Sequence, residues 1–320
     1  MNSREVALER FCERLCQGDE AALARAISLI DANLAAGSLI HRSVVSRAGG
    51  ATVIGFTGPP GVGKSTLIDA LVTQLRADGE RVAVVAVDPS SPLSGGAVLG
   101  DRTRMGRHTD DPGVFIRSVS AQGHLGGLSM SILRILDLVD VAGWTTIVLE
   151  TVGAGQSETE VADVADVSVV LNAPGLGDDV QAIKAGILEI ADILVVNKSD
   201  LPNADATKRQ LESMLKLRPE NAQDIPVVCT TASEHKGITG LLVAIQNRSK
   251  EKFRGAPDER RCARTRSMLA QQLATQVKRQ ILHNDAPEVR ELVESVSKGA
   301  LEPEEALTYF LHSDGPGIPA

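Results

Sequence analysis

The chain has 320 residues, of which 43% are hydrophobic and 23% charged, a composition typical of one large globular domain or one domain with appendages. A net charge of −8 argues against nucleic acid or an anionic membrane as the main partner. No apolar run approaches the roughly 18 residues of a membrane span, and the first residues resemble neither a signal nor a transit peptide. Four cysteines without metal-binding spacing predict a reducing, cytoplasmic environment.

Residues 1–48 are predicted to form an N-terminal helical extension. Within it, residues 3–36 indicate two helices that are split at Gly18-Asp19, with Asp19 as the N-cap of the second. One apolar stripe at helical spacing is predicted on that second helix, formed by Leu23, Ala26, Ile27, Ile30 and Leu34.

The most informative stretch follows a short, β-branched strand pattern at residues 52–57. Residues 58–65 spell Gly-x-x-x-x-Gly-Lys-Ser, and residues 65–76 then have helical spacing. A strand, a glycine loop and a helix in this order surround a phosphate with backbone N–H groups. The predicted phosphate-binding residues are Gly58, Pro59, Pro60, Gly61, Val62, Gly63, Lys64 and Ser65, with Lys64 on the β- and γ-phosphates and the Ser65 hydroxyl on Mg²⁺.

A second strand is predicted at residues 81–87, reached through the helix after the phosphate loop, so that the first two strands are parallel. This order differs from Ras-type GTPases, in which an effector loop and an antiparallel hairpin follow the first helix. The strand ends in Asp88, which places a carboxylate at the ligand-binding edge of the sheet. A glycine-rich segment at 94–105 follows, and its Asp101 is a candidate for holding Mg²⁺ or positioning the attacking water.

A third buried strand at 145–149 ends in Glu150-Thr-Val-Gly, where most GTPases have Asp-x-x-Gly. A glutamate at a strand end is commonly a solvated residue. Its position between the other two motifs favours a role in the magnesium site instead.

The base is indicated by a strand at 193–196 that ends in Asn197-Lys-Ser-Asp200. Asn-Lys-x-Asp at this position is the guanine-binding loop of GTPases. The Asp200 carboxylate can accept from guanine N1–H and from the N2 amino group, whereas adenine offers no such pair of donors. GTP is therefore the predicted nucleotide.

The remaining organisation is predicted from composition and spacing. Residues 49–249 form the nucleotide domain, and a basic, proline-containing stretch at 248–261 is a predicted linker with solvated charges. Residues 250–320 contain three short helical patterns that are too small to bury their apolar stripes alone. They are expected to pack on the nucleotide domain, on a second copy of the chain or on a partner.

Several motifs together resemble the methylmalonyl-CoA mutase-associated GTPase (MeaB/ArgK/MMAA) family. They are Val-Asp-Pro-Ser-Ser at 87–91, Leu-Gly-Asp-Arg-Thr-Arg-Met at 99–105, Glu-Thr-Val-Gly-Ala-Gly-Gln-Ser-Glu at 150–158 and Asn-Lys-Ser-Asp. The resemblance covers nearly the whole chain. It implies an α/β P-loop NTPase with a mostly parallel sheet flanked by helices, N- and C-terminal helical extensions, and a homodimer. It also implies a GTPase that gates cofactor loading and protects or reactivates an adenosylcobalamin-dependent acyl-CoA mutase.

The same resemblance assigns roles residue by residue. It places Thr66 with Lys64 and Ser65 on the phosphates and Mg²⁺, and gives Asp88, Asp101 and Glu150 the acidic magnesium and hydrolysis shell. Asn197, Lys198 and Asp200 hold guanine, with a last guanine loop at Thr231, Ala232 and Ser233, in which Thr231-Ala232 stands where Ser-Ala is usual. Switch residues are expected at Gln156, Asp178, Gln181 and Lys184, although an ordinary strand-to-helix turn capped by Asp178 explains the last three equally well on sequence alone.

Two other functions are considered. A nickel-insertion GTPase needs clustered Cys or His, and the six histidines here are scattered. A P-loop kinase needs an acceptor pocket with a base, for which Asp88 or Asp101 could serve.

Overall fold

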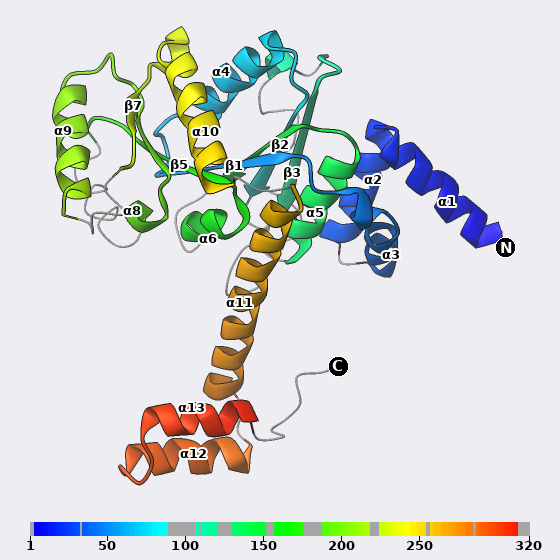
Figure 1. Cartoon of the computed structure of the whole chain (residues 1–320), viewed down its shortest axis with the longest axis vertical. Helices are drawn as coiled ribbons and strands as arrows, with labels where there is room; N and C mark the ends of the chain where they lie inside the picture. Colours follow the sequence, from blue (N-terminus) through cyan, green and yellow to red (C-terminus); the bar gives the residue numbers. More distant parts are fainter. Residues whose placement is uncertain are drawn as a thin grey trace. The chain divides into compact units, whose positions relative to one another are not determined.

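The structure is a computed structural model that describes residues 3–32, 34–88, 106–108, 110–120, 130–151, 157–175, 187–217, 224–253, 257–283 and 286–312. The chain divides into two compact units, Met1–Met268 and Leu269–Ala320 (Figure 1).

The first unit is built on a seven-stranded sheet in the order β3-β2-β4-β1-β5-β6-β7. Every neighbouring pair in this order is parallel. The strands are β1 Thr52–Thr57, β2 Val82–Asp88, β3 Val114–Ser120, β4 Thr146–Thr151, β5 Val167–Asn172, β6 Ile193–Val196 and β7 Val227–Cys229. The predicted parallel α/β fold is confirmed, including the parallel direction of the second strand. Because all strands run the same way, their carboxyl ends lie at one edge, where ligands of such sheets bind.

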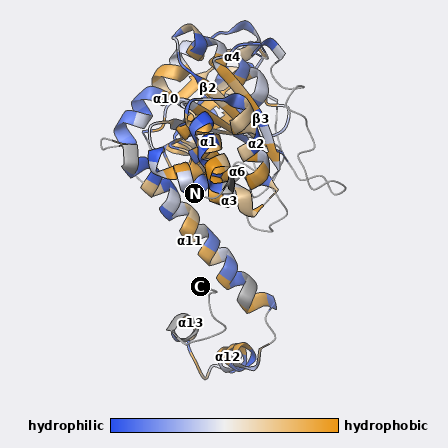
Figure 2. Cartoon of the chain, turned by 90° about the vertical axis from the view of Figure 1, so that its right-hand side faces the viewer, coloured by the Kyte–Doolittle hydropathy of each residue, from blue (hydrophilic) through white to orange (hydrophobic). Residues whose placement is uncertain are grey.

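Helices cover both faces of the sheet (Figure 1). On one face lie α4 and α10, which pack on each other and share an apolar cluster with the strands; on the other lie α2, α3, α5 and α6. The helices are α1 Ser3–Cys16, α2 Glu20–Asp31, α3 Ala35–Val44, η1 Val45–Arg47, α4 Lys64–Ala77, η3 Gly106–His108, α5 Met130–Val141, α6 Ser157–Val164, α8 Ile187–Ile190, α9 Ala204–Leu215, η5 Ala232–Glu234, α10 Ile238–Lys252, α11 Pro257–His283, α12 Pro287–Ser297 and α13 Pro303–His312. Figure 2 shows apolar residues concentrated on the strands, whereas α11 carries both polar and apolar residues along its length. Within the part of the chain that the structure describes, none of these helices combines the length and the apolarity that crossing a membrane requires.

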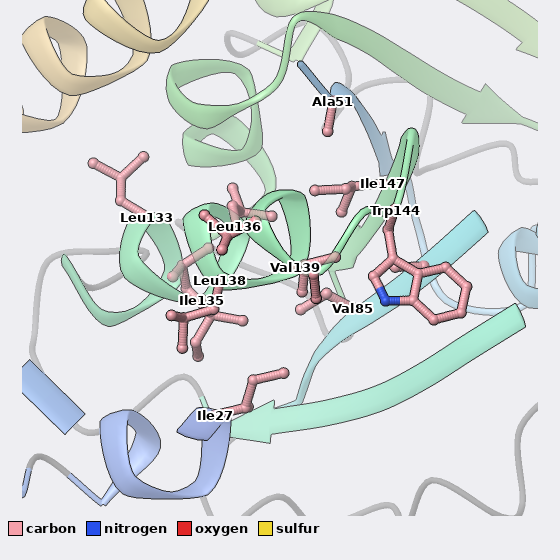
Figure 3. Packing of buried hydrophobic residues seen from close by; sticks show 14 of the residues in the cluster. Ile27, Ala51, Val85, Leu133, Ile135, Leu136, Leu138, Val139, Trp144 and Ile147 are labelled. Carbon is pink, nitrogen blue, oxygen red and sulfur yellow. The ribbon is translucent and has the colours of Figure 1, made fainter. Parts of the chain in front are cut away.

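A large apolar cluster joins the N-terminal extension to the sheet (Figure 3). Ile27 of α2 and Ile135 and Leu138 of α5 are fully buried in it, together with Val85 and Ile147 from the strands. Trp144 lies beside them under the Arg81 guanidinium, which is 4.3 Å from the ring centroid. Each fully buried side chain of this size contributes about 1.5–3 kcal/mol. The extension is therefore part of the first unit's core.

The prediction for the N-terminal extension is partly wrong. Asp19 does cap α2, accepting from Ala22 N at 2.9 Å, but α2 ends at Asp31. Leu34, assigned to the same stripe, is 50% exposed in extended backbone at the start of a third helix, α3. Gly37 allows α3 to lie close against α2, because a Cβ there would be 2.8 Å from the Ile30 nitrogen. A helical glycine of this kind weakens the local helix signal.

The predicted linker at 248–261 is also shorter than expected. The helix α10 continues to Lys252, and α11 begins at Pro257. The Arg248 side chain donates to the Asp192 and Asp224 carbonyls, and Arg261 donates to the carbonyls of Val45 and Ala48. These arginines fasten elements together, contrary to the prediction of merely solvated charges.

The second unit contains α12 and α13, which pack against each other. The three predicted C-terminal helical patterns correspond to α11, α12 and α13. Val289 and Ala306 are buried, whereas Leu273, Val293 and Leu307 are about half exposed.

Candidate nucleotide-binding site

The phosphate loop connects β1 to α4 through left-handed backbone at Gly58, Gly61 and Gly63. At Gly58 and Gly63 an added Cβ would also clash with neighbouring atoms. A Cβ on Gly58 would be 2.5 Å from the Leu171 carbonyl oxygen, and one on Gly63 would be 2.6 Å from Asn197 Nδ2. The loop consequently passes close to β5 and to the residue that follows β6, which only glycine permits.

Lys64 begins α4, and its ammonium group lies back over the loop. Its Nζ donates to the carbonyl oxygens of Gly58 at 2.5 Å and Pro59 at 3.2 Å, and the residue is only 9% exposed. A buried cation at the N-terminus of a helix, beside backbone N–H groups, is a setting for phosphate. Ser65 and Thr66 follow in the first turn of α4, and Pro60, Gly61 and Val62 complete the loop.

Acidic side chains lie at the carboxyl edge of the sheet beside this loop. Ser65 Oγ donates to Glu150 Oε1 at 2.7 Å, and Glu150 is 1% exposed at the end of β4. Asp88 ends β2 and is fully buried. Glu150 pairs in register with Phe56 of β1 and Ala86 of β2, which places its strand between the other two. A hydroxyl and two buried carboxylates are the oxygen ligands that suit Mg²⁺, so the residues present fit this ion.

The Asn-Lys-x-Asp segment follows β6 and contacts the phosphate loop directly. Asn197 is buried; its Nδ2 donates to the Val62 carbonyl at 2.9 Å, and its Oδ1 accepts from Thr230 Oγ1 at 3.0 Å and Ala232 N at 3.2 Å. Lys198 has a left-handed backbone, and its Nζ donates to the Gly61 carbonyl at 2.8 Å. The two predicted nucleotide loops are therefore joined by direct hydrogen bonds.

Asp200 is exposed beside the turn that follows β7. In this turn Thr231 and Lys236 exchange two backbone hydrogen bonds, which closes the loop through Ala232 and Ser233. The Lys236 ammonium pairs with Glu234 at 2.6 Å. This pair, and to a smaller extent the charge of Asp200, raises the pKa of Lys236.

Sequence reasoning missed Thr230, whose hydroxyl orients Asn197. The adjacent Thr-Ala-Ser pattern could have located it. Five predicted residues, Asp101, Gln156, Asp178, Gln181 and Lys184, lie outside the described residues. The structure brings together the remaining predicted residues at the carboxyl edge of the sheet. They lie at the ends of β2 and β4 and in the segments that follow β1, β6 and β7.

Comparisons with known proteins agree over most of the chain. Residues 23–286 match the family described as methylmalonyl Co-A mutase-associated GTPase MeaB. A protein of Pyrococcus abyssi is 40% identical over 317 residues, 95% of this chain and 96% of that protein. The GTPase ArgK of Escherichia coli is 40% identical over 250 residues, 75% of this chain and 76% of ArgK. The crystal structure of a LAO/AO transport system kinase is similar, with a TM-score of 0.74, 28% identity, and coverage of 97% of this chain and 98% of that one. With a parallel P-loop fold and a candidate nucleotide site at its phosphate and Asn-Lys-x-Asp loops, the chain is a GTPase that belongs to the methylmalonyl-CoA mutase-associated GTPase family, MeaB.

Proposed function

We propose that this GTPase acts as a chaperone for an adenosylcobalamin-dependent acyl-CoA mutase, either methylmalonyl-CoA mutase or a relative such as 2-hydroxyisobutyryl-CoA mutase. In this role it gates the loading of the mutase cofactor and protects or reactivates the mutase. The observation that carries the proposal is the family match over residues 23–286, because that range takes in the phosphate loop, the acidic edge and the guanine loop together. The nickel-insertion alternative has no comparable support.

Within this proposal, the chain's own residues divide the work of hydrolysis. Lys64 and the backbone N–H groups of the phosphate loop bind the β- and γ-phosphates. Ser65, Asp88 and Glu150 hold Mg²⁺, to which the sequence adds Asp101. When bound, Mg²⁺ supplies positive charge that offsets the charge on the transferred phosphoryl group.

The guanine loop provides specificity. Asn197 and Lys198 are held against the phosphate loop by their bonds to Val62 and Gly61, so base and phosphate binding are coupled geometrically. The exposed Asp200 carboxylate then accepts from the two adjacent guanine donors.

In this proposal the protein is a homodimer, and the C-terminal region, residues 250–320, forms the interface between the two copies. Its support is the set of apolar side chains left about half exposed or more on α11, α12 and α13, namely Leu273, Leu282, Val293 and Leu307. Exposed apolar surface commonly marks an interaction site where it is contiguous.

The deciding experiment measures GTP hydrolysis with and without each candidate mutase of the source organism. Alone, the protein should turn over at roughly 10⁻⁴ to 10⁻² per second, the range of GTPases without a supplied catalytic group. The cognate mutase should accelerate it. Equal rates with and without every candidate mutase would refute partner-gated hydrolysis.

The segment 174–184 is proposed to carry the coupling to the mutase. The Gln181→Ala/Lys184→Ala double variant should lose the acceleration while the GTP dissociation constant and basal rate stay unchanged. An intact acceleration in this variant would assign the coupling to another part of the chain.

A kinase is the second candidate, because the similar crystal structure is that of a LAO/AO transport system kinase. Radiolabelled GTP separates the two activities. A GTPase releases labelled free phosphate, whereas a kinase places the label on an acceptor.

A further inference from the structure

The end of β2, where Asp88 lies, pairs with the end of β3. The described register between β2 and β4 runs from Val82–Thr146 to Val87–Thr151. The register between β2 and β3 runs from Val82–Val114 to Asp88–Ser120, so Asp88 and Ser120 are paired across the ladder. Since neighbouring strands lie about 4.8 Å apart, Ser120 lies directly beside Asp88 on the β3 side.

Ser120 is the last residue of β3, which is an edge strand of the sheet. It is tied to the N-terminal extension by one carboxylate. Asp31, the last residue of α2, accepts from Ser120 N at 3.2 Å and from Ser120 Oγ at 3.1 Å. These bonds join residues that are 89 positions apart in the sequence.

The position of Asp31 is set by the packing of the helix that it ends. Ile27 and Ile30, one turn and one residue before it, are buried in the core, and Asp19 caps the other end of α2. Burial raises the pKa of Asp31, opposed by the hydrogen bonds from Ser120 and the charge of Arg117. A partly desolvated carboxylate that accepts two hydrogen bonds from one residue fixes the position of that residue.

We propose that Asp31 is a positioning residue for the nucleotide site: it holds the end of β3, and through the Asp88–Ser120 pair it sets the position of Asp88 at the magnesium-binding edge. The N-terminal extension thus supports the GTPase site, in addition to covering one face of the sheet. This inference rests on the proposed magnesium role of Asp88. Residues that hydrogen-bond directly to metal ligands commonly change metal affinity by 10–100-fold when they are removed, which sets the upper end of the effect expected for Asp31.

The chain offers a matched control on the same helix and strand. Ser28, three residues before Asp31, accepts from Arg117 Nη2 at 2.8 Å, and Arg117 lies three residues before Ser120 on β3. Ser28→Ala removes a tie between α2 and β3 away from the end of β2. Asp31→Asn retains an oxygen that can accept from Ser120, so it should restore most of the function that Asp31→Ala loses.

The test is a Mg²⁺ titration of GDP release, with full-length protein loaded with a fluorescent N-methylanthraniloyl-GDP. We expect Asp31→Ala to raise the half-saturating Mg²⁺ concentration by on the order of ten-fold, and Ser120→Ala, which removes only the hydroxyl donor, by less. The kcat of GTP hydrolysis at limiting Mg²⁺ should fall in parallel, while KM for GTP at saturating Mg²⁺ changes less than about two-fold. Ser28→Ala should leave all three quantities unchanged.

The Asp88→Asn variant separates the possible failures. If Asp88→Asn raises the Mg²⁺ requirement and Asp31→Ala does not, the role of Asp31 is refuted and that of Asp88 stands. If Asp88→Asn has no effect, the magnesium role of Asp88 fails, and the inference fails with it. Equal effects of Ser28→Ala and Asp31→Ala would also refute the inference, because a general loosening of α2 would then explain both.

Discussion

Asn197 and Lys198 both bond the phosphate loop, and Asn197 is the buried one of the two, which makes Asn197→Ala the most direct perturbation of the site. Asn197 makes three side-chain hydrogen bonds, to Val62, Thr230 and Ala232, and is 2% exposed. At about 1 kcal/mol net for each bond, the variant should lose about 3 kcal/mol of unfolding free energy. For a unit of this size, that corresponds to a fall in Tm of roughly 6–12 °C.

A second substitution divides this effect. Asn197→Asp keeps an acceptor for Thr230 and Ala232 but turns an oxygen toward the Val62 carbonyl oxygen in place of the amide donor. The loss of unfolding free energy, about 1–3 kcal/mol, should then come only from the contact with the Val62 carbonyl. Because that contact positions the two loops relative to each other, we expect both variants to weaken GDP binding by about ten-fold, or 1.4 kcal/mol of ligand-dependent stabilisation at fixed GDP.

The assay is thermal unfolding with and without GDP, supported by calorimetric titration of GDP. Ser199→Ala is the matched control: Ser199 Oγ donates to the Val196 and Thr230 carbonyls, and both bonds stay between β6 and the loop after β7. It should lower Tm but keep GDP affinity within about two-fold. The reasoning is refuted if Asn197→Ala unfolds within 2 °C of the wild type, or if it weakens GDP binding no more than Ser199→Ala does.

Three further outcomes follow from individual contacts. Calorimetry should find GTP and GDP bound far more tightly than ATP, with guanine-nucleotide binding weakened in Asp200→Asn; equal affinity of the wild type for ATP and GTP would contradict the guanine assignment. The Arg76 side chain and the Gly113 N–H lower the pKa of Asp111 below its ordinary 3.8, so the ionised carboxylate stabilises the fold above that pH. In denaturant unfolding, Asp111→Asn should therefore lose about 1 kcal/mol of unfolding free energy at pH 7, and this loss should shrink as the pH falls below about 4. Asp166 is fully buried and bonded to Arg264 Nη1 at 3.2 Å, so Asp166→Asn should lose about 3 kcal/mol in the same measurement, and an added Arg264→Met should restore part of it.

Local patterns predicted those parts of the site that are local in the chain. The phosphate loop and the Asn-Lys-x-Asp loop each need a strand, a short motif and a following turn, and all of these are contiguous in the sequence. The position of Glu150 was predicted in the same way, since it directly follows a buried strand, and the structure places it within hydrogen-bonding distance of Ser65.

The supports of the site could not be predicted in this way, because each depends on a contact between distant segments. The bond between Thr230 and Asn197 joins two strand ends, and the pairing of Asp31 with Ser120 joins a helix to an edge strand. Neither pairing leaves a periodic or compositional signal. The boundary between α2 and α3 could not be predicted for a related reason. Gly37 of α3 is required by the close approach of α2, a contact that local sequence does not show, and as a glycine it weakens the helical pattern of α3.

The strand that carries the phosphate loop is fastened at both ends. At its carboxyl end, β1 passes into the loop that Asn197 and Lys198 hold. At its amino end, Val53 N donates to Asp166 Oδ2 at 2.8 Å, while Arg264 on α11 bonds the same carboxylate oxygen and Arg260 bonds the Thr52 hydroxyl. Between these ends β1 is paired with β4 and β5 on its two sides. A strand held in two ladders and by buried charge at one end resists displacement along its axis. A response to the γ-phosphate is therefore expected in the connections at the carboxyl edge of the sheet, because moving these costs less than moving β1. The proposed switch segments follow their strands in the sequence at this same edge.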